Sequence, residues 1–304
     1  MSTLRVSIPA AMRGAFAMVQ AVSEPLAARL AERWFFSPPR RRASEGVDAF
    51  LSTGRRSEQS VDGRSIVGWE WGVGPVVYLV HGWGSRGGRL RAFMEPLTHA
   101  GYRVVTFDAP GHGESDGRLS SMPEFARALR AVVERFGSAR AIIAHSLGSS
   151  ATALAASWGV EAQRFVLIAP AADPPSYADA FGAALGARPT VLARARANSE
   201  HRLGFSWTEL DVCAVGRRMT APALIVHDRG DEVVPFSEGA AIAASWPGAR
   251  LLATSGLGHR GVLHDPGVVS QILEFVTDEA FAPARLSTTG QLEHELFHRE
   301  TRWR

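Results

Sequence analysis

The chain has 304 residues, of which 46% are hydrophobic and 21% are charged. This composition is typical of a globular protein, and the length allows one large α/β domain with an insertion. The net charge is only +3 and every basic residue is arginine, so the high isoelectric point reflects missing lysine more than a basic surface. No basic stripe with interleaved aromatic residues is present, which argues against nucleic-acid binding.

Cysteine usage and hydropathy constrain the location. Cys213 is the only cysteine, so no disulfide can form within the chain, which fits a reducing compartment. Charged residues such as Arg13 and Glu24 interrupt the apolar stretch at residues 8–36, and no uncharged run reaches the ~20 residues of a membrane-spanning helix. A secretory signal is a poor match, because its apolar core would not contain Arg13. A cytoplasmic location is the default expectation.

The first apolar stretch, residues 9–36, predicts an amphipathic helical region broken near Pro25. Its apolar side has to be buried, and we expect it to pack against residues 171–221 and to shape the entrance to the candidate site. That side comprises Val19, Val22, Leu26, Leu30 and Trp34. A less favoured alternative is that aromatic residues 34–36 and the arginines at 40–42 contact a membrane surface.

Beyond residue 60, short apolar runs alternate with helical patterns. Residues 60–71 alternate around a turn at Asp62 and Gly63, as an antiparallel hairpin does. Apolar runs predict strands at residues 76–80, 102–107, 139–143, 165–168, 223–226 and 250–253. Helices are expected at residues 89–99, 123–136 and 149–158. Such alternation indicates a parallel sheet covered by helices on both faces.

This alternation stops between residues 170 and 222. The segment contains a predicted helix at residues 176–185, an arginine-rich stretch near Arg194 and Arg196, and a last helix at about residues 207–219. The expected divisions are an N-terminal helical extension (1–59), a core (60–170 and 222–280), a helical insertion (171–221) and a C-terminal tail (281–304). His294 and His298 of the tail are expected at the surface, because no rigid element there would hold metal ligands at the required spacing.

Ser146 lies where a strand is expected to turn sharply into a helix. The apolar run at residues 139–143 precedes it, and a helix of small residues at 149–158 follows. Ala144 and Gly148, two positions to either side, are small, as a strained strand-to-helix turn requires because the two elements approach closely there. This context predicts a nucleophile elbow.

Four other segments surround this serine in order. HGWGS at residues 81–85 and DAPGHGES at residues 108–115 each follow a predicted strand. Downstream, HDRGDEVVP at residues 227–235 contains Asp231, and SGLGH at residues 255–259 ends in His259. With this order of motifs, roughly residues 60–280 resemble the α/β-hydrolase superfamily, and within it the serine esterase and lysophospholipase-like branch.

The resemblance implies a mostly parallel central sheet flanked by helices, with a short helical cap inserted after the sixth strand. It also implies a catalytic triad of Ser146, His259 and Asp231, because a serine hydroxyl needs a base and the base needs an orienting carboxylate. The backbone N–H groups of Trp83 and Leu147 would form the oxyanion hole. No cofactor and no metal are implied.

Asp228 and His264 compete for the roles of acid and base. Only Asp231 has Val and Pro at the matching offset, and His259 lies in a glycine-flanked loop directly after a strand. Replacing Asp228 or His264 is therefore expected to be nearly silent.

Three more histidines have structural interpretations. His145 is expected to point to the other side of the elbow and to make a structural hydrogen bond. The resemblance places His81 and His112 where they would brace loops.

Tyr177, Phe181 and Trp207 of the insertion are candidates for an apolar substrate pocket, although packing between the cap and the core is an equal alternative. The motifs favour a serine hydrolase that cleaves a small carboxylic ester through an acyl-enzyme. A thioesterase or aminopeptidase with the same triad, or a non-catalytic ligand-binding homologue, is the alternative. Dehalogenase and epoxide hydrolase activities are disfavoured, because they need a carboxylate in place of Ser146. The motifs do not specify an oligomeric state.

Overall fold

The computed structural model describes residues 8–39 and 45–278. The arginine run at 40–42 and the tail histidines, His294 and His298, lie outside these residues. The described chain contains one eight-stranded sheet with strand order β1-β2-β4-β3-β5-β6-β7-β8. The strands are β1 (Arg55–Val61), β2 (Arg64–Trp71), β3 (Val76–Val80), β4 (Arg103–Phe107), β5 (Ala139–His145), β6 (Phe165–Ile168), β7 (Ala223–Asp228) and β8 (Arg250–Thr254).

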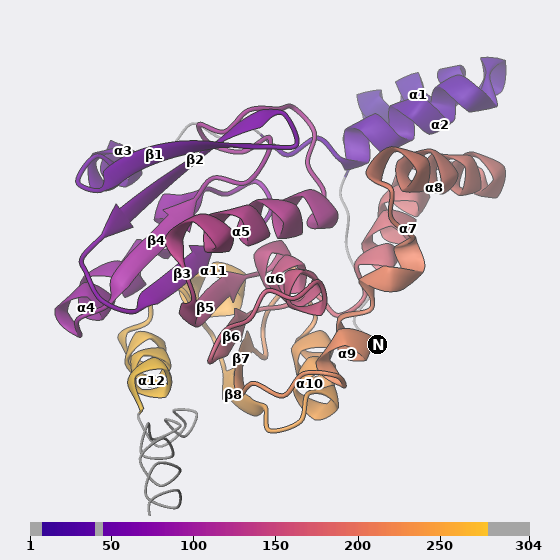
Figure 1. Ribbon diagram of the computed structural model, residues 1–304. Coiled ribbons are helices and arrows are strands. Elements are labelled where there is room, and N and C mark those ends of the chain that lie inside the picture. The colour runs from indigo at the N-terminus through magenta and orange to yellow at the C-terminus, as the bar shows by residue number, and fades with distance from the viewer. Residues whose placement is uncertain (1–7, 40–44, 279–304) are drawn as a thin grey trace, which may run out of the picture.

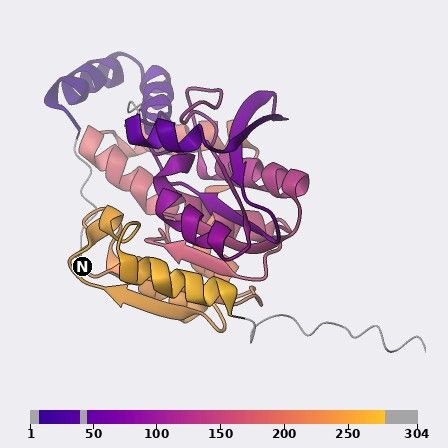
Figure 2. The ribbon, with the colours of Figure 1, turned by 90° about the vertical axis from the view of Figure 1, so that its left-hand side faces the viewer.

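Strand directions and helix layers match the predicted fold class (Figures 1 and 2). The β1–β2 and β2–β4 pairs are antiparallel, and every other pair in the sheet is parallel. On one face lie α5 (Met122–Phe136), α6 (Leu147–Ser157) and α10 (Phe236–Ser245), and on the other lie η1 (Gly87–Phe93), α4 (Met94–His99) and α12 (Pro266–Thr277). Two short helices, α3 (Glu45–Leu51) and α11 (Gly258–Gly261), complete this part. The prediction of a mostly parallel sheet flanked by helices is confirmed.

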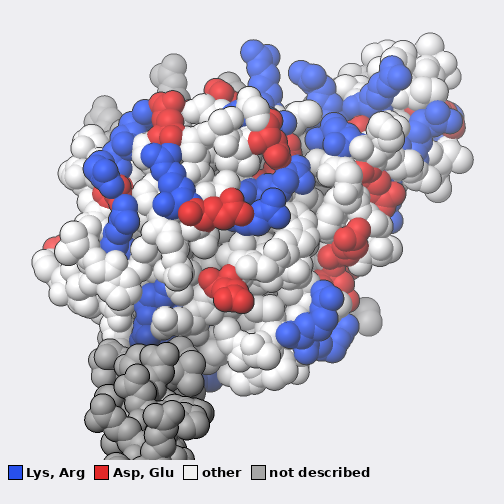
Figure 3. Space-filling model, in the orientation of Figure 1, with Lys and Arg blue, Asp and Glu red and all other residues white. Residues whose placement is uncertain are grey.

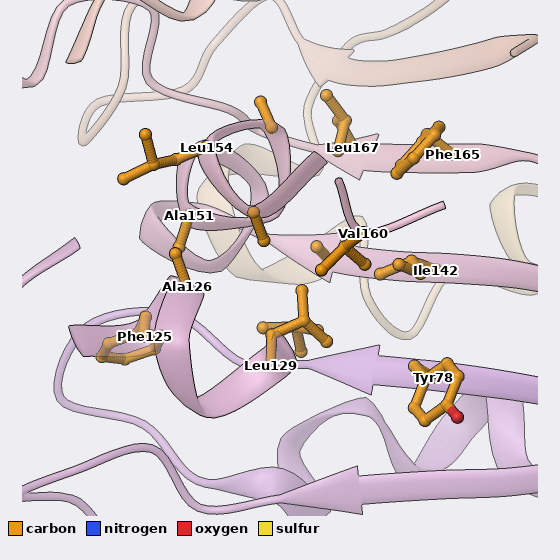
Figure 4. Close-up of a cluster of buried hydrophobic side chains, with 14 of the residues drawn as sticks. Tyr78, Phe125, Ala126, Leu129, Ile142, Ala151, Leu154, Val160, Phe165 and Leu167 are labelled. Carbon is orange, nitrogen blue, oxygen red and sulfur yellow. The ribbon is translucent and has the colours of Figure 1, made fainter. Parts of the chain in front are cut away.

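The core is divided by the sheet into two apolar layers. Tyr78 and Ile142 belong to the layer with Phe125 of α5, whereas Leu79 and Ile143 belong to the opposite layer. Successive side chains of a strand point to opposite faces, so a strand covered on both sides has to be apolar throughout. Figure 4 shows the first layer, where strand side chains meet α5 and α6.

The hairpin at the sheet edge starts earlier than the sequence predicts. β1 begins at Arg55 rather than at residue 60, and Val61 is its only apolar residue. As an exposed edge strand it carries mostly polar side chains, which gives no hydrophobic signal. The turn at Asp62 and Gly63 is where it was predicted, with φ values of 50° and 74° that suit a tight hairpin turn.

The insertion between β6 and β7 is helical. It contains α7 (Pro174–Leu185), α8 (Pro189–Leu203), η2 (Trp207–Leu210) and α9 (Val212–Gly216). Gly186 and Gly204 end α7 and α8 in the left-handed conformation that glycine tolerates best. The single helix predicted at 207–219 is instead two short helices, because Asp211 is extended and its side chain caps α9.

The N-terminal segment forms two helices, α1 (Ala10–Val22) and α2 (Glu24–Phe35), which pack against α7 and α8. The expected packing against the insertion is confirmed, and Val19, Leu30 and Trp34 of the predicted apolar side contribute to it, but the prediction is wrong for Val22 and Leu26. Val22 and Leu26 are 86% and 53% exposed, whereas Phe16, Ala27, Ala28 and Ala31 are buried. The chain breaks at Ser23, which caps α2, so one helical periodicity cannot continue through both helices. No helix in the described ranges is long and apolar enough to cross a membrane.

Gln20 joins the N-terminal pair to the insertion. Its side-chain amide donates to the carbonyl oxygen of Gly186 at 3.3 Å, and its side-chain oxygen accepts from the N–H of Arg188 at 2.7 Å.

We expect Gln20→Ala to lower the free energy of unfolding by about 1 kcal/mol, because two hydrogen bonds made by a buried side chain are lost. Urea unfolding followed by circular dichroism measures the change. Val22→Ala, at an exposed position on the same helix, is the matched control and should stay within about 0.5 kcal/mol of the parent. Equal stability of the two variants would show that this contact does not hold the helices in place.

Candidate active site

Ser146 lies at the sharp junction of β5 and α6 with φ 54° and ψ −126°. A residue with a side chain rarely adopts a positive φ, so the backbone is strained here. The N–H of Ser146 donates to the carbonyl oxygen of Ile168 at 2.8 Å, which fixes the turn to β6. A Cβ at Gly148 would clash with the carbonyl oxygen of His81, and one at Gly82 would lie 2.9 Å from the Cβ of Ser146. Glycine is therefore required at both positions.

The structure brings Ser146, His259 and Asp231 together from three different loops. The Nε2 atom of His259 lies 3.1 Å from the Oγ of Ser146, and its Nδ1 atom lies 2.8 Å from Oδ2 of Asp231. These loops follow β5, β7 and β8, which are parallel, so their carboxyl ends meet at one edge of the sheet.

The hydrogen bonds indicate which ring nitrogen of His259 carries the proton. A carboxylate only accepts hydrogen bonds, so Nδ1 of His259 carries the proton toward Asp231. In the neutral imidazole, Nε2 is then a free lone pair facing the Ser146 hydroxyl. This arrangement lets Nε2 take the proton of Ser146 while Asp231 stabilises the resulting positive ring.

Asp231 is buried, and burial alone would raise the pKa of its carboxyl. Hydrogen bonds outweigh this effect and hold its pKa below the ordinary value, because His227, His259 and the N–H of Val234 all interact with the charged form. A second backbone donor, the N–H of Val233, lies 2.8 Å from Oδ1. Asp231 therefore remains a carboxylate at neutral pH.

The backbone around Trp83 and Leu147 adjoins the serine. Leu147 is the first residue of α6, where a helix leaves its N–H groups unpaired and its dipole favours negative charge. Within residues 8–39 and 45–278, neither the Trp83 nor the Leu147 N–H donates to a protein acceptor. The Trp83 loop is fixed on its far side, since the N–H of Gly84 donates to Nε2 of His112 at 3.0 Å.

In His81 and His112, each of the two ring nitrogens makes a hydrogen bond to the backbone of a loop. Nε2 of His81 accepts from the N–H of Ala109 at 3.0 Å, and its Nδ1 donates to the carbonyl oxygen of Gly82 at 2.8 Å. Nδ1 of His112 likewise donates to the carbonyl oxygen of Pro110 at 3.0 Å. Burial lowers the pKa of His81 to about 4 and that of His112 to about 3. Both rings stay neutral, and both join the loop after β3 to the loop after β4.

The sequence predicted that His145 points to the other side of the elbow and makes a structural hydrogen bond. The hydrogen bond is present, but the ring lies beside that of His259. Nε2 of His145 donates to the backbone carbonyl oxygen of His259 at 2.9 Å, and the two rings lie 4.7 Å apart. Burial, followed by the nearby His259, lowers the pKa of His145 to about 3. His145, the neighbour of Ser146, is thus a neutral support for the loop of His259, and no sequence pattern signals this choice of partner.

Asp228 also supports the histidine loop. It is buried, and its carboxylate accepts from the Thr254 hydroxyl at 2.8 Å, the Leu257 N–H at 3.0 Å and the Gly230 N–H at 2.9 Å. Burial would raise the pKa of Asp228, but these bonds lower it overall. The expectation that an Asp228 substitution is nearly silent is therefore revised. His264 is exposed in the turn between α11 and α12.

Two of the three candidate pocket residues, Phe181 and Trp207, lie between the insertion and the N-terminal helices. Phe181 and Trp207 have ring centroids 5.5 and 6.0 Å from that of Phe35. The cavity among them has a volume of only about 30 Å³, room for about one water molecule. The Tyr177 hydroxyl instead donates to Glu238 of α10 at 2.9 Å, which ties α7 to the core.

The N-terminal segment also contacts the loop that carries Trp83, one of the two oxyanion-hole candidates. The carbonyl oxygen of Phe36 accepts from the N–H of Ser120 at 2.8 Å. A Cβ at Gly84, which has φ 62°, would lie 2.6 Å from Cγ of Pro39. Residues 36–39 therefore join the insertion to the loop that carries Trp83. The sequence offers no signal for this contact, because it depends on where two distant segments meet.

Comparisons with known proteins agree with this architecture. Residues 73–213 match the family model described as serine aminopeptidase, S33. A pimeloyl-[acyl-carrier protein] methyl ester esterase from Methylococcus capsulatus is 50% identical over 44 residues, which are 14% of this chain and 17% of that protein. Lysophosphatidylserine lipase ABHD12 from Danio rerio is 29% identical over 188 residues, 54% of this chain and 45% of that protein. The chain thus spans less than half the length of these curated relatives.

Solved structures extend the likeness to most of the chain. An esterase from Exiguobacterium antarcticum has a TM-score of 0.57 and 18% identity, covering 74% of this chain and 100% of its own. A bromoperoxidase from Bacillus anthracis has a TM-score of 0.57 and 19% identity over the same shares. At this identity the structures show the fold and do not define the reaction. The chain therefore has the fold of the α/β-hydrolases.

We expect Asp228→Asn to lower the free energy of unfolding by about 1–3 kcal/mol, because an amide donor would face buried N–H groups. If activity depends on His259, displacement of its loop should also lower kcat by up to about 100-fold. Urea unfolding and ester kinetics measure the two effects. His264→Gln, at the exposed position, is the control and should match the parent. A silent Asp228→Asn would restore the original expectation.

Stability should decrease with falling pH because His81, His112 and His145 are buried in the neutral form. Their pKa values in the folded chain are lowered, so below about pH 6.5 the unfolded chain binds protons that the folded chain does not. The loss should reach about 1.4 kcal/mol per pH unit for each histidine down to roughly pH 4. Urea unfolding at several pH values measures the slope, which His145→Gln should reduce by one histidine's share. A flat profile would contradict neutral burial.

Proposed function

We propose that the protein is a serine hydrolase that cleaves a carboxylic ester through an acyl-enzyme intermediate. The observation that carries this proposal is the continuous hydrogen-bonded series from Ser146 through His259 to Asp231, with the serine on a strained turn. A strained serine costs stability, and it is retained where the position of its hydroxyl matters for function.

The geometry supports a specific sequence of steps. Oγ of Ser146 attacks the ester carbonyl carbon as Nε2 of His259 takes its proton, and the carbonyl oxygen becomes an oxyanion. The N–H groups of Trp83 and Leu147 would stabilise that charge, because donors held in place before the reaction need no reorganisation. His259 then donates its proton to the leaving alcohol oxygen as the C–O bond breaks. A water molecule, deprotonated by the same nitrogen, attacks the acyl-enzyme and releases the acid and Ser146.

An ester is preferred to an amide as the substrate for two reasons. The names of the relatives include a methyl ester esterase and a lipase, and an esterase shares the fold over nearly three quarters of the chain. The match to the family described as serine aminopeptidase makes an N-terminal amide the second candidate. Thioesters require the same groups, so the triad itself does not discriminate among them.

Ser146→Ala should lower kcat for short p-nitrophenyl esters by a factor on the order of 10⁴ to 10⁶, because the nucleophile is lost. Steady-state kinetics on the purified full chain measure this, with circular dichroism to confirm folding. Asp231→Asn and His259→Gln should cause losses of similar scale, since triad members act as a unit. More than a tenth of the activity remaining in folded Ser146→Ala would exclude the mechanism.

Parallel assays with an aminoacyl p-nitroanilide separate the two substrate candidates. The proposal expects the ester to have the higher kcat/KM. Faster anilide cleavage, abolished by Ser146→Ala, would keep the triad and replace the esterase assignment with aminopeptidase. The absence of turnover on esters, thioesters and anilides would favour a non-catalytic ligand-binding role.

A further inference from the structure

Large apolar side chains remain exposed on the N-terminal helix pair. We call the patch formed by Met18 and Val22 of α1 with Leu26, Arg29 and Arg33 of α2 the outer face. Met18 is 69% exposed, Val22 86% and Leu26 53%, and both arginines are exposed. Contiguous exposed apolar side chains on a protein surface are characteristic of a binding site.

The outer face lies opposite the sides that hold the helices in place. α1 buries Phe16 and Gln20, and α2 buries Ala27, Ala28 and Ala31, against the insertion. At 100° per residue, Met18 and Val22 lie on the far side of α1 from Phe16 and Gln20. Leu26, Arg29 and Arg33 are spaced by three and four residues and lie on the far side of α2 from its alanines. Both helices thus turn a side away from the rest of the described chain, and none of its residues covers that side.

The charge on this face has one sign. The two acidic residues of α2 turn toward the insertion, where Glu32 pairs with Arg202 at 2.8 Å and Glu24 lies 3.0 Å from the Thr190 hydroxyl. α1 contains no acidic residue. Arg29 and Arg33 form no ion pair with any residue in the described ranges. The outer face therefore combines an apolar centre with free positive charge.

The position of the outer face favours an extended flat partner over one that needs a complementary shape. The α1–α2 pair projects from the body at the edge of the molecule (Figure 1), and its outer end in Figure 3 is largely uncharged, with mostly basic and some acidic side chains beside it. A stable interface with a second copy usually involves about 20–30 residues a side, far more than this projecting patch offers. A bilayer needs no complementary shape, and it accepts apolar side chains below the head groups while anionic lipids attract arginine.

We propose that the outer face docks the protein onto an anionic lipid surface, with Met18, Val22 and Leu26 inserted and Arg29 and Arg33 at the head groups. The inference does not depend on the proposed esterase function. If both hold, the helix pair would place the insertion beside the bilayer, and esters dissolved in lipid would be the accessible substrates.

Co-sedimentation of the full chain with phosphatidylglycerol-containing and pure phosphatidylcholine vesicles tests the proposal. We expect binding to the anionic vesicles that weakens as salt is added. The triple variant Met18→Ser, Val22→Ser, Leu26→Ser should bind at least about tenfold more weakly, because its apolar insertion is lost. Replacing Arg29 and Arg33 by Gln should cost about fivefold per arginine. Val73→Ser, at an 80% exposed valine outside the pair, is the matched control and should bind like the parent.

Circular dichroism and thermal melting show that each variant is folded, independently of any enzyme activity. Failure of the parent chain to bind anionic vesicles at low salt would overturn the proposal, and so would equal binding by the triple variant. Sedimentation velocity tests the alternative that a second copy of the chain covers the outer face. A parent dimer that the triple variant converts to a monomer would assign the outer face to a second copy of the chain instead.

Discussion

The left-handed backbone at Ser146 is the constraint on which the rest of the site depends. A side chain in this region costs about 1–3 kcal/mol, and surrounding contacts have to impose it. Here β5 and α6 are almost wholly buried, the Ser146 N–H is bound to Ile168, and Gly82 and Gly148 allow neighbouring backbones to approach. The sheet therefore fixes the serine hydroxyl before any ligand arrives, which is the condition for catalysis by preorganised groups.

Neutral histidines and buried carboxylates form the frame around that hydroxyl. His81 and His112 connect the loops that follow β3 and β4, while His145 and Asp228 both bond to the loop of His259. Each makes directed bonds to backbone groups, so loop positions are set by hydrogen-bond geometry and not by packing alone. The N-terminal segment adds a further support, since Pro39 lies against Gly84. Parts of the chain outside the sheet thus share in positioning the site.

The sequence predicts those features that depend on local pattern. Continuous apolar runs give the buried strands, and small residues around Ser146 give the elbow, because burial and close approach restrict the residue types directly. It fails where the outcome depends on distant partners. The polar edge strand β1 carries no hydrophobic signal, the break at Ser23 resets the phase that placed Val22 and Leu26 inside, and Asp228 gains its partners only when β7 and β8 pair. The positions of Ser146, His259 and Asp231 follow from motif order, as do the loop-bracing roles of His81 and His112, whereas the supports from Asp228 and Pro39 do not.

The central claim is that Ser146 is an activated nucleophile, and reaction with a fluorophosphonate probe tests it independently of the substrate. The probe phosphonylates only a serine whose proton can be removed and whose oxyanion is stabilised. Intact-mass and peptide mass spectrometry of the full chain should show one adduct, on Ser146, with labelling strongly slowed in His259→Gln. A folded chain that remains unlabelled, or that is labelled at another serine, would contradict the account.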